Sequence, residues 1–156
     1  TYQDTDTLGD NLDTSSSGGG QSDVVFSVPS TIEAELFAAM NGIQTEASTD
    51  SGGGTGGGRN IGYVDAGDWL QYNIDVQTPG SYLIEYRVAS YLGSSGFATL
   101  VNGAEIDSQS VPNTGGWQNW TTLSATIDLQ AGEQVLRINA AGPSWNMNWI
   151  RLSVSN

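Results

Sequence analysis

Hydrophobic and polar side chains alternate along most of the chain after about residue 23. Residues 82–88 are the clearest case, because Leu83, Glu85 and Arg87 alternate there with large apolar residues. A repeat of two residues is typical of a β-strand with one face buried. The same reasoning predicts about nine strands, at residues 24–28, 31–35, 68–76, 80–89, 96–101, 104–111, 117–128, 134–140 and 146–153.

Turn sequences rich in Gly, Pro and Asn separate the predicted strands. Asn102 and Gly103 stand between two apolar runs, and both residue types accept the positive φ that a two-residue hairpin requires. The number and spacing of the strands predict an all-β fold, a jelly-roll β-sandwich of two antiparallel sheets, and argue against a parallel α/β enzyme. The only helical segment that we expect is a single turn near residues 36–40.

Residues 1–22 lack this periodicity. They hold four Asp, no basic residue and a Ser/Gly run. Such a composition buries too little apolar surface to offset the entropy lost on ordering. We therefore expect two parts: an acidic, flexible linker at residues 1–22 and a β-sandwich domain at residues 23–156.

The amino-acid composition limits the kinds of reaction and partner that are expected for this domain. The 156 residues include 17 Asp and Glu against 4 Arg, with no Lys, His or Cys, for a formal net charge of -13. Disulfides, thiolate chemistry and the commonest general base are therefore excluded. Because the excess negative charge repels phosphate groups, we expect neither nucleic acid nor a membrane as a partner.

Two carboxylates stand out at the first strands. Glu33 and Glu35 lie two apart on a predicted strand, so both side chains share one face. A glycosidase pair must face each other across a sugar at roughly 5 to 9 Å, and two carboxylates on one strand face cannot bracket a ring. Calcium, which takes about six to eight oxygen ligands, fits this pair better. A solvated strand edge is the alternative.

Two aromatic residues stand in loops rather than in apolar runs. Trp117 follows the loop 112–116, where a large ring has little to pack on, and Tyr63 closes a Gly-rich stretch. An exposed ring beside amides such as Asn60 and Asn146 suits a pyranose, whose C–H face stacks on the ring while its hydroxyls need donors and acceptors. Core packing is the alternative. Three further aromatic residues lie within apolar strands and are expected in the core: Trp69, Tyr72 and Trp149.

Six motifs occur in a characteristic order. They are Thr31-Ile-Glu-Ala-Glu35, Gly42-Ile-Gln-Thr-Glu46, Asn60-Ile-Gly-Tyr-Val-Asp-Ala-Gly-Asp-Trp-Leu-Gln-Tyr72, Gly80-Ser-Tyr82, Gly115-Gly-Trp-Gln-Asn-Trp120 and Trp145-Asn-Met-Asn-Trp-Ile-Arg151. Over about residues 28–154, this series resembles the family 6 carbohydrate-binding modules. Within that family, the series resembles modules appended to agarases of marine bacteria.

The resemblance implies a β jelly-roll that binds polysaccharide without cleaving it and tethers an appended glycoside hydrolase to its substrate. In that family a cleft among the loops at one edge holds a sugar between two rings, here Tyr63 and Trp117. The matching amide is Asn146, which would bond the sugar hydroxyls. Glu46 matches an acidic position that meets a terminal sugar in some members.

The resemblance also implies a structural calcium ion near the first strand. Its ligands would be Glu33, Glu35, Asn148 and a backbone oxygen near Arg59. Many relatives have Asp where this chain has Asn148, so the shell implied here carries one charge fewer.

Together these features predict a non-catalytic module for a neutral polysaccharide, because few basic residues are available to bind uronate or sulfate groups. Agarose chains or their ends are the first candidate, and β-glucan or xylan the next. We expect a secreted, extracellular monomer that forms part of a larger glycoside hydrolase such as an agarase. Two alternatives are a small glycoside hydrolase or lyase that uses Asp65, Asp68 or Glu46, and a calcium-dependent structural or adhesion module.

Overall fold

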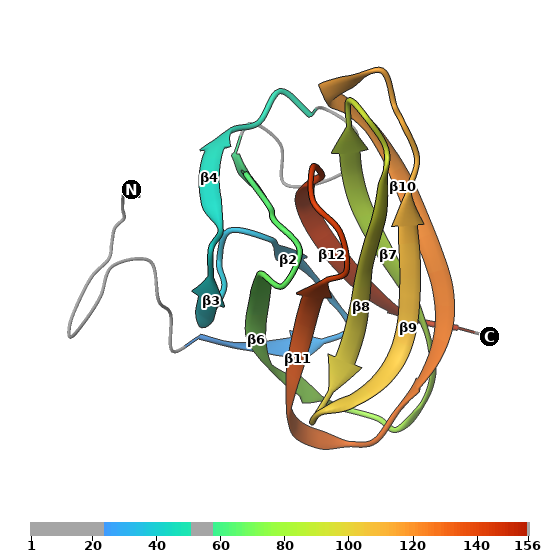
Figure 1. Cartoon of the computed structure of the whole chain (residues 1–156). Coiled ribbons are helices and arrows are strands. Elements are labelled where there is room, and N and C mark those ends of the chain that lie inside the picture. The colour runs from blue at the N-terminus through green and yellow to red at the C-terminus, as the bar shows by residue number, and fades with distance from the viewer. Residues whose placement is uncertain (1–23, 51–57, 156) are drawn as a thin grey trace.

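The computed structural model of the chain describes residues 24–50 and 58–155 (Figure 1). The predicted linker, residues 1–22, and most of the Gly-rich stretch, residues 51–57, lie outside the described residues. The described part contains twelve strands: β1 (Val25–Val28), β2 (Ser30–Glu33), β3 (Ala39–Asn41), β4 (Gln44–Ala47), β5 (Arg59–Gly62), β6 (Trp69–Val76), β7 (Gly80–Ser90), β8 (Ser94–Val101), β9 (Ala104–Val111), β10 (Gly116–Leu129), β11 (Gly132–Ala140) and β12 (Asn146–Val154).

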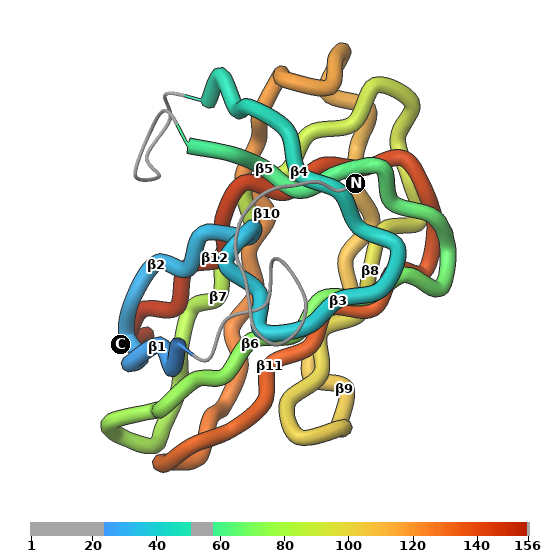
Figure 2. The backbone as a smooth tube through the Cα atoms, turned by 90° about the vertical axis from the view of Figure 1, so that its left-hand side faces the viewer, coloured from blue at the N-terminus to red at the C-terminus, as the bar shows by residue number. Residues whose placement is uncertain are grey.

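The strands form two six-stranded sheets. One sheet has the order β1-β6-β11-β8-β9, with β3 also on β6; the other has the order β10-β7-β12-β5-β4, with β2 also on β12. Figure 2 shows β4 and β5 side by side at the margin of the second sheet. Neighbouring strands are antiparallel except β1 and β6, which are parallel. The predicted all-β sandwich is confirmed, with this one parallel pair at an edge.

The long strands agree with the predicted ones to within a few residues. Alternation is strict in β7, where Tyr82, Ile84, Tyr86 and Val88 are buried while the residues between them are half-exposed. Three strands were missed because β3, β4 and β5 have only three or four residues and no clear period. The helical turn expected at residues 36–40 is wrong: β3 occupies its end, and no helix occurs among residues 24–50 and 58–155.

No segment of the described chain forms a helix able to cross a membrane.

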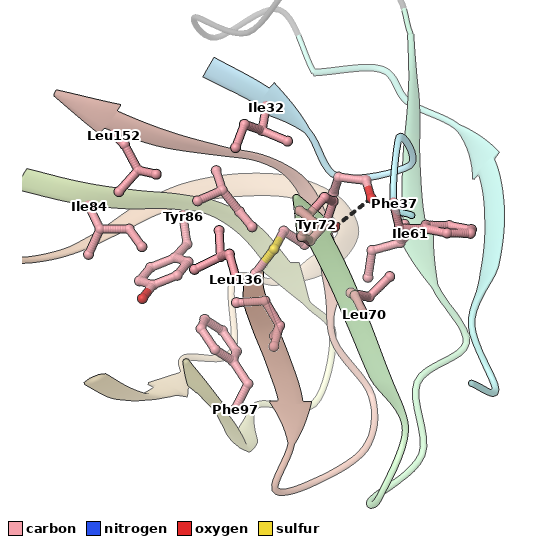
Figure 3. Close-up of a cluster of buried hydrophobic side chains, with 14 of the residues drawn as sticks. Ile32, Phe37, Ile61, Leu70, Tyr72, Ile84, Tyr86, Phe97, Leu136 and Leu152 are labelled. Atoms are coloured by element: carbon pink, nitrogen blue, oxygen red, sulfur yellow. Dashed lines mark hydrogen bonds between the residues drawn. The ribbon is translucent and has the colours of Figure 1, made fainter. Parts of the chain in front are cut away.

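The core lies between the sheets and is rich in aromatic rings (Figure 3). Tyr72 is fully buried, and its hydroxyl donates to the carbonyl oxygen of Ala34 at 2.6 Å, which satisfies the polar end of the ring. Trp149 is buried as predicted. The prediction for Trp69 is only partly right, because its ring is half-buried, with the guanidinium of Arg137 4.1 Å from the ring centroid.

Two long strands lose their regular register near one end. The pairing of β10 with β7 shifts between Gly116 and Thr121, and that of β12 with β7 shifts between Met147 and Trp149. Asn148 is the extra residue in β12, with no partner in β7. A bulge interrupts the alternation of side chains, so the faces on which Asn146 and Asn148 lie do not follow from their spacing alone.

Candidate functional site

A network of polar side chains is centred on Glu46 in β4. Its Oε2 accepts hydrogen bonds from Asn60 Nδ2 in β5 at 3.2 Å, Gln118 Nε2 in β10 at 3.0 Å and Asn146 Nδ2 in β12 at 3.2 Å. Asn60 and Asn146 are buried, whereas Glu46 is half-buried. Bonds to a charged acceptor are stronger than neutral ones. One carboxylate therefore joins four strands of the second sheet; we call these four residues the Glu46 network.

Gln118 uses both ends of its amide. Besides Glu46, its Nε2 donates to Asn60 Oδ1 at 3.0 Å, and its Oε1 accepts from the backbone N–H and the hydroxyl of Thr49 at 2.8 and 3.1 Å. The sequence analysis assigned no role to Gln118. Its one signal was its place next to Trp117 in a recognised motif. The bulge in β10, for which the sequence gives no sign, covers the segment that contains both residues.

Tyr63 and Trp117 are the exposed rings that the sequence predicted. Their relative exposures are 61% and 42%, so the core-packing alternative is wrong for both. The backbone of Trp117 is tied to the network, since its carbonyl oxygen accepts from Asn146 Nδ2 at 2.7 Å. The charge of Glu46, together with a hydrogen bond between that carboxylate and the Tyr63 hydroxyl, raises the pKa of Tyr63. The structure thus groups the four predicted sugar-binding residues.

The turn that presents Tyr63 has an unusual backbone. Tyr63 has φ of 59°, a left-handed conformation that is strained for a residue with a side chain. The preceding Gly62 is required for another reason: a Cβ there would lie 2.4 Å from Asn146 Oδ1. Any larger residue at that position would push the Asn146 amide out of the network.

No positive side chain is bonded to the Glu46 network among the described residues, which include all four arginines of the chain. All four bond to polar side chains outside the network, and two of them also lie over tryptophan rings. Their partners include Thr45 for Arg59, Asp50 for Arg87, Asn139 and the Trp69 ring for Arg137, and Thr31 and the Trp149 ring for Arg151. The site therefore favours an uncharged ligand over an anionic one.

A second acidic group lies at the start of the described chain. Strand β2 ends at Glu33, so Glu35 stands in the following turn and not on the predicted strand. The two carboxylates nevertheless converge: a Cβ placed on Gly58 would be 3.6 Å from both Glu33 Oε1 and Glu35 Oε2. Glu35 Oε1 is buried and has no hydrogen-bond partner among the described residues. We call Glu33, Glu35 and Gly58 the acidic pocket.

Burial dominates the electrostatics of this pocket. The pKa of Glu35 is raised from 4.5 to about 8, chiefly by burial and in part by the charge of Glu33, while hydrogen bonds from the backbone at Glu35 and Arg59 act in the opposite direction. A hard cation would supply the missing partner for the buried oxygen and reverse this effect. The residues present therefore fit a calcium ion.

Asn148 is close to this pocket but is held elsewhere. Its backbone carbonyl accepts from the N–H of Ala34 at 2.9 Å, between the two glutamates. Its Nδ2 donates to Asp50 Oδ2 at 2.9 Å, and Asp50 in turn forms an ion pair with Arg87. Only the amide oxygen of Asn148 is left for a cation. No group of three acidic, His or Cys side chains in the described chain could hold a metal, so amide and carbonyl oxygens would have to complete the shell.

Two of the three carboxylates of the hydrolase alternative, those of Asp68 and Glu46, have structural partners. Asp68 Oδ2 accepts from the N–H of Asp65 at 2.8 Å, and the N–H of Asp68 donates to the carbonyl of Asp65 at 3.1 Å, which closes a turn. Glu46 is held by three amides. This arrangement does not favour acid–base catalysis.

Comparison with known proteins identifies the family of this chain. A family model described as carbohydrate binding module (family 6) matches residues 33–154. The chain is 38% identical over 125 residues to the clotting factor G alpha subunit of Tachypleus tridentatus, covering 78% of this chain and 18% of that protein. It is 33% identical over 101 residues to beta-agarase AgaA of Microbulbifer thermotolerans, covering 60% and 23%. The chain thus spans about a fifth of the length of each relative.

Two solved structures share the fold over nearly their whole length. The carbohydrate-binding module from Cellvibrio mixtus lichenase 5A, in complex with cellotriose, is 42% identical with a TM-score of 0.72, covering 83% of this chain and 99% of that one. The C-terminal family 6 module of LamC, a laminarinase from Zobellia galactanivorans, is 39% identical with a TM-score of 0.73, covering 80% and 98%.

Proposed function

The chain belongs to the family 6 carbohydrate-binding modules, and from this premise we propose that Tyr63 and Trp117 hold a sugar of a neutral polysaccharide above the Glu46 network. The observation that carries this proposal is the pair of exposed rings beside buried amides and one carboxylate, with no positive group bonded to them. Family membership itself confirms the predicted resemblance and the prediction of a binding module rather than an enzyme.

In the proposed complex, the C–H face of a pyranose stacks on Trp117 and Tyr63, while Asn146 and Glu46 bond its hydroxyls. A stacked ring contributes about 1 kcal/mol beyond burial, and a neutral hydrogen bond contributes about 1 kcal/mol net. A few such contacts give micromolar to millimolar affinity. Attachment to a polymer with many equivalent sites increases the effective affinity.

Agarose is the first candidate polymer. It rests on the resemblance of the motifs to modules of agarases and on the similarity to beta-agarase AgaA. A β-glucan is the second candidate, favoured by the higher identity to the lichenase module solved with cellotriose and to the laminarinase module. In either case we propose that the module is a secreted monomer that holds an attached glycoside hydrolase on its substrate.

Replacement of one ring tests the site. In affinity electrophoresis through gels containing agarose, laminarin or xylan, we expect the protein to be retarded and Trp117→Ala to migrate freely with an unchanged melting temperature. Val154→Ala, at an exposed residue near the far end of β12, is the control and should be retarded normally. Retardation of Trp117→Ala equal to that of the unaltered protein would show that the sugar binds elsewhere.

We propose further that calcium binds in the acidic pocket and has a structural role. Glu33 and Glu35 would supply carboxylate oxygens, with Asn148 and a backbone oxygen near Arg59 as neutral ligands. Glu35 Oε1, which is buried and has no hydrogen-bond partner in the described part of the chain, supports this assignment. Calcium added to chelated protein should raise its melting temperature, and magnesium, which demands a tighter octahedral shell, should raise it less.

A further inference from the structure

A third exposed ring lies beside Trp117. Tyr91, in the turn after β7, is 54% exposed, and its ring centroid lies 6.3 Å from that of Trp117 with the ring planes 48° apart. The adjacent Leu92 is 65% exposed. Figure 1 places the end of β7 and the start of β10 at the same end of the sandwich. Contiguous exposed apolar residues of this kind mark binding surfaces more often than isolated ones do.

The turn that carries Tyr91 is anchored. Ser90 is fully buried, and its hydroxyl donates to the carbonyl of Ser144 at 2.6 Å and accepts from the N–H of Gly93 at 2.8 Å. Its backbone N–H and carbonyl both bond to Thr114 in the loop that leads to β10. These bonds fix the positions of Tyr91 and of the loop before Trp117 relative to each other. A ring held in place before the ligand arrives loses little entropy when it binds.

We propose that Tyr91 forms a second sugar subsite, which takes the unit adjacent to the one stacked on Trp117. The inference rests on the proposed function of Trp117. The separation of the two ring centroids is comparable with the length of one pyranose unit, so consecutive sugars of one chain can each meet a ring. The two arginine–ring pairs found in the described part of the chain involve Trp69 and Trp149 instead, which suits a neutral chain at Tyr91 and Trp117.

The angle between the rings selects the shape of that chain. Rings tilted by 48° match consecutive sugars that are turned relative to each other, as in the helical chains of agarose and β-1,3-glucan. A flat β-1,4-linked ribbon presents nearly parallel sugar faces and would match only one ring at a time. The occupant of the Tyr91 subsite is therefore the next unit of a twisted neutral polysaccharide.

Calorimetric titration with saccharides of one to six units tests this subsite, because a single unit occupies the Trp117 position alone and a second unit reaches Tyr91. The ligands are β-1,3-linked gluco-oligosaccharides and agaro-oligosaccharides, with β-1,4-linked gluco-oligosaccharides as the flat series. In at least one twisted series, affinity should rise with length, by roughly two- to tenfold when the second ring is engaged. Tyr91→Ala should lose this gain while binding the shortest ligand normally, and Tyr91→Phe should keep it.

Each of the other possible results of the titration contradicts one part of the proposal. If Tyr91→Ala weakens all lengths equally, Tyr91 only supports the Trp117 ring, and if it weakens none, the subsite does not exist. If the flat series shows the same Tyr91-dependent gain, the assignment to twisted chains is wrong. If the unaltered protein binds none of the three series, the proposed sugar site fails and the subsite fails with it.

Discussion

Glu46 lies in β4 and Glu35 lies just after β2, and these two strands belong to the same sheet. The surroundings of the two carboxylates nevertheless differ sharply. Three amide groups from three strands donate to Glu46 Oε2. Glu35 Oε1, by contrast, is buried without a hydrogen-bond partner in the described part of the chain, and burial raises the pKa of this acid to about 8.

The contrast shows that two glutamates of one chain can differ in how far the protein itself satisfies their carboxylates. At Glu46 the protein supplies the donors itself, and the exposed rings beside it leave room for hydroxyl groups of a ligand. At Glu35 the protein supplies backbone N–H donors to the carboxylate but leaves Oε1 without a partner among the described residues, and a buried unpaired oxygen of this kind is costly unless a cation joins it. The polar groups at Glu46 are therefore already paired within the protein, whereas the proposed calcium ion would complete the site at Glu35.

Removal of calcium should have the largest effect. Because the pKa of Glu35 lies above its value in an unfolded chain, metal-free protein is fully stabilised only below about pH 4.5. It should then lose stability as the pH rises towards 8, by on the order of 4 kcal/mol in all. With chelator present, we expect the melting temperature to fall by about 10 °C or more over this range. Calcium should remove the fall.

Matched amide variants separate the two acids. Glu35→Gln should melt at nearly the same temperature from pH 5 to 8 in chelator and gain little from calcium. Glu46→Gln should keep the full calcium response. A calcium response in Glu35→Gln equal to that of the unaltered protein would place the ion elsewhere.

Glu46→Gln should have the next largest effect, this time on sugar binding. It removes a charged acceptor, and hydrogen bonds to charged groups contribute about 1.5–3 kcal/mol. We therefore expect oligosaccharide affinity to fall roughly ten- to a hundredfold by calorimetry. Unchanged affinity would mean that Glu46 only supports the strands.

Gln118→Ala should act more weakly on both properties. It deletes bonds to Glu46, Asn60 and Thr49 at the edge of the network, for a loss of about 1–2 kcal/mol of folding stability and a few-fold loss of affinity. Asn119→Ala, at the exposed neighbouring position, is the control for thermal melting and titration. Equal melting temperatures of the two variants would contradict the role of Gln118.

The smallest effect concerns the Tyr63 hydroxyl. Since the Glu46 charge is the largest cause of the raised Tyr63 pKa, Glu46→Gln should lower that pKa towards 10. Phenolate absorbance followed during a base titration, with the Tyr63→Phe curve subtracted, measures it. A Tyr63 pKa that does not move in Glu46→Gln would show that the two side chains do not interact.

Much of this architecture could be predicted because it follows from the alternation of buried and exposed residues along the strands. The buried face of β7 follows directly from alternation. Strands β3 to β5 could not be predicted in the same way, since three or four residues are too few to show a period. Each depends on its partner strand: β3 pairs with β6, β5 with β12, and β4 with β5.

The sequence predicted which residues lie at the candidate site, but not the hydrogen bonds that connect them. Loop positions indicated Tyr63 and Trp117, and the motifs indicated Asn146 and Glu46. The bond from Asn148 to Asp50 and the role of Gln118 depend on side chains that meet across 98 and 72 positions of sequence, next to bulges that no local pattern marks. The calcium and sugar assignments themselves stay predictions.

The bulges in β10 and β12 have a consequence for how such a module can diversify. Irregular pairing is confined to one end of each strand, and from Thr121 and Trp149 onward the register with β7 is continuous. A substitution near Trp117 or Asn146 can therefore alter the proposed sugar site without shifting the paired residues that enclose the core. The residues that stabilise the fold and those proposed to determine specificity thus lie on different parts of the same strands, so a change of ligand does not require a change of fold.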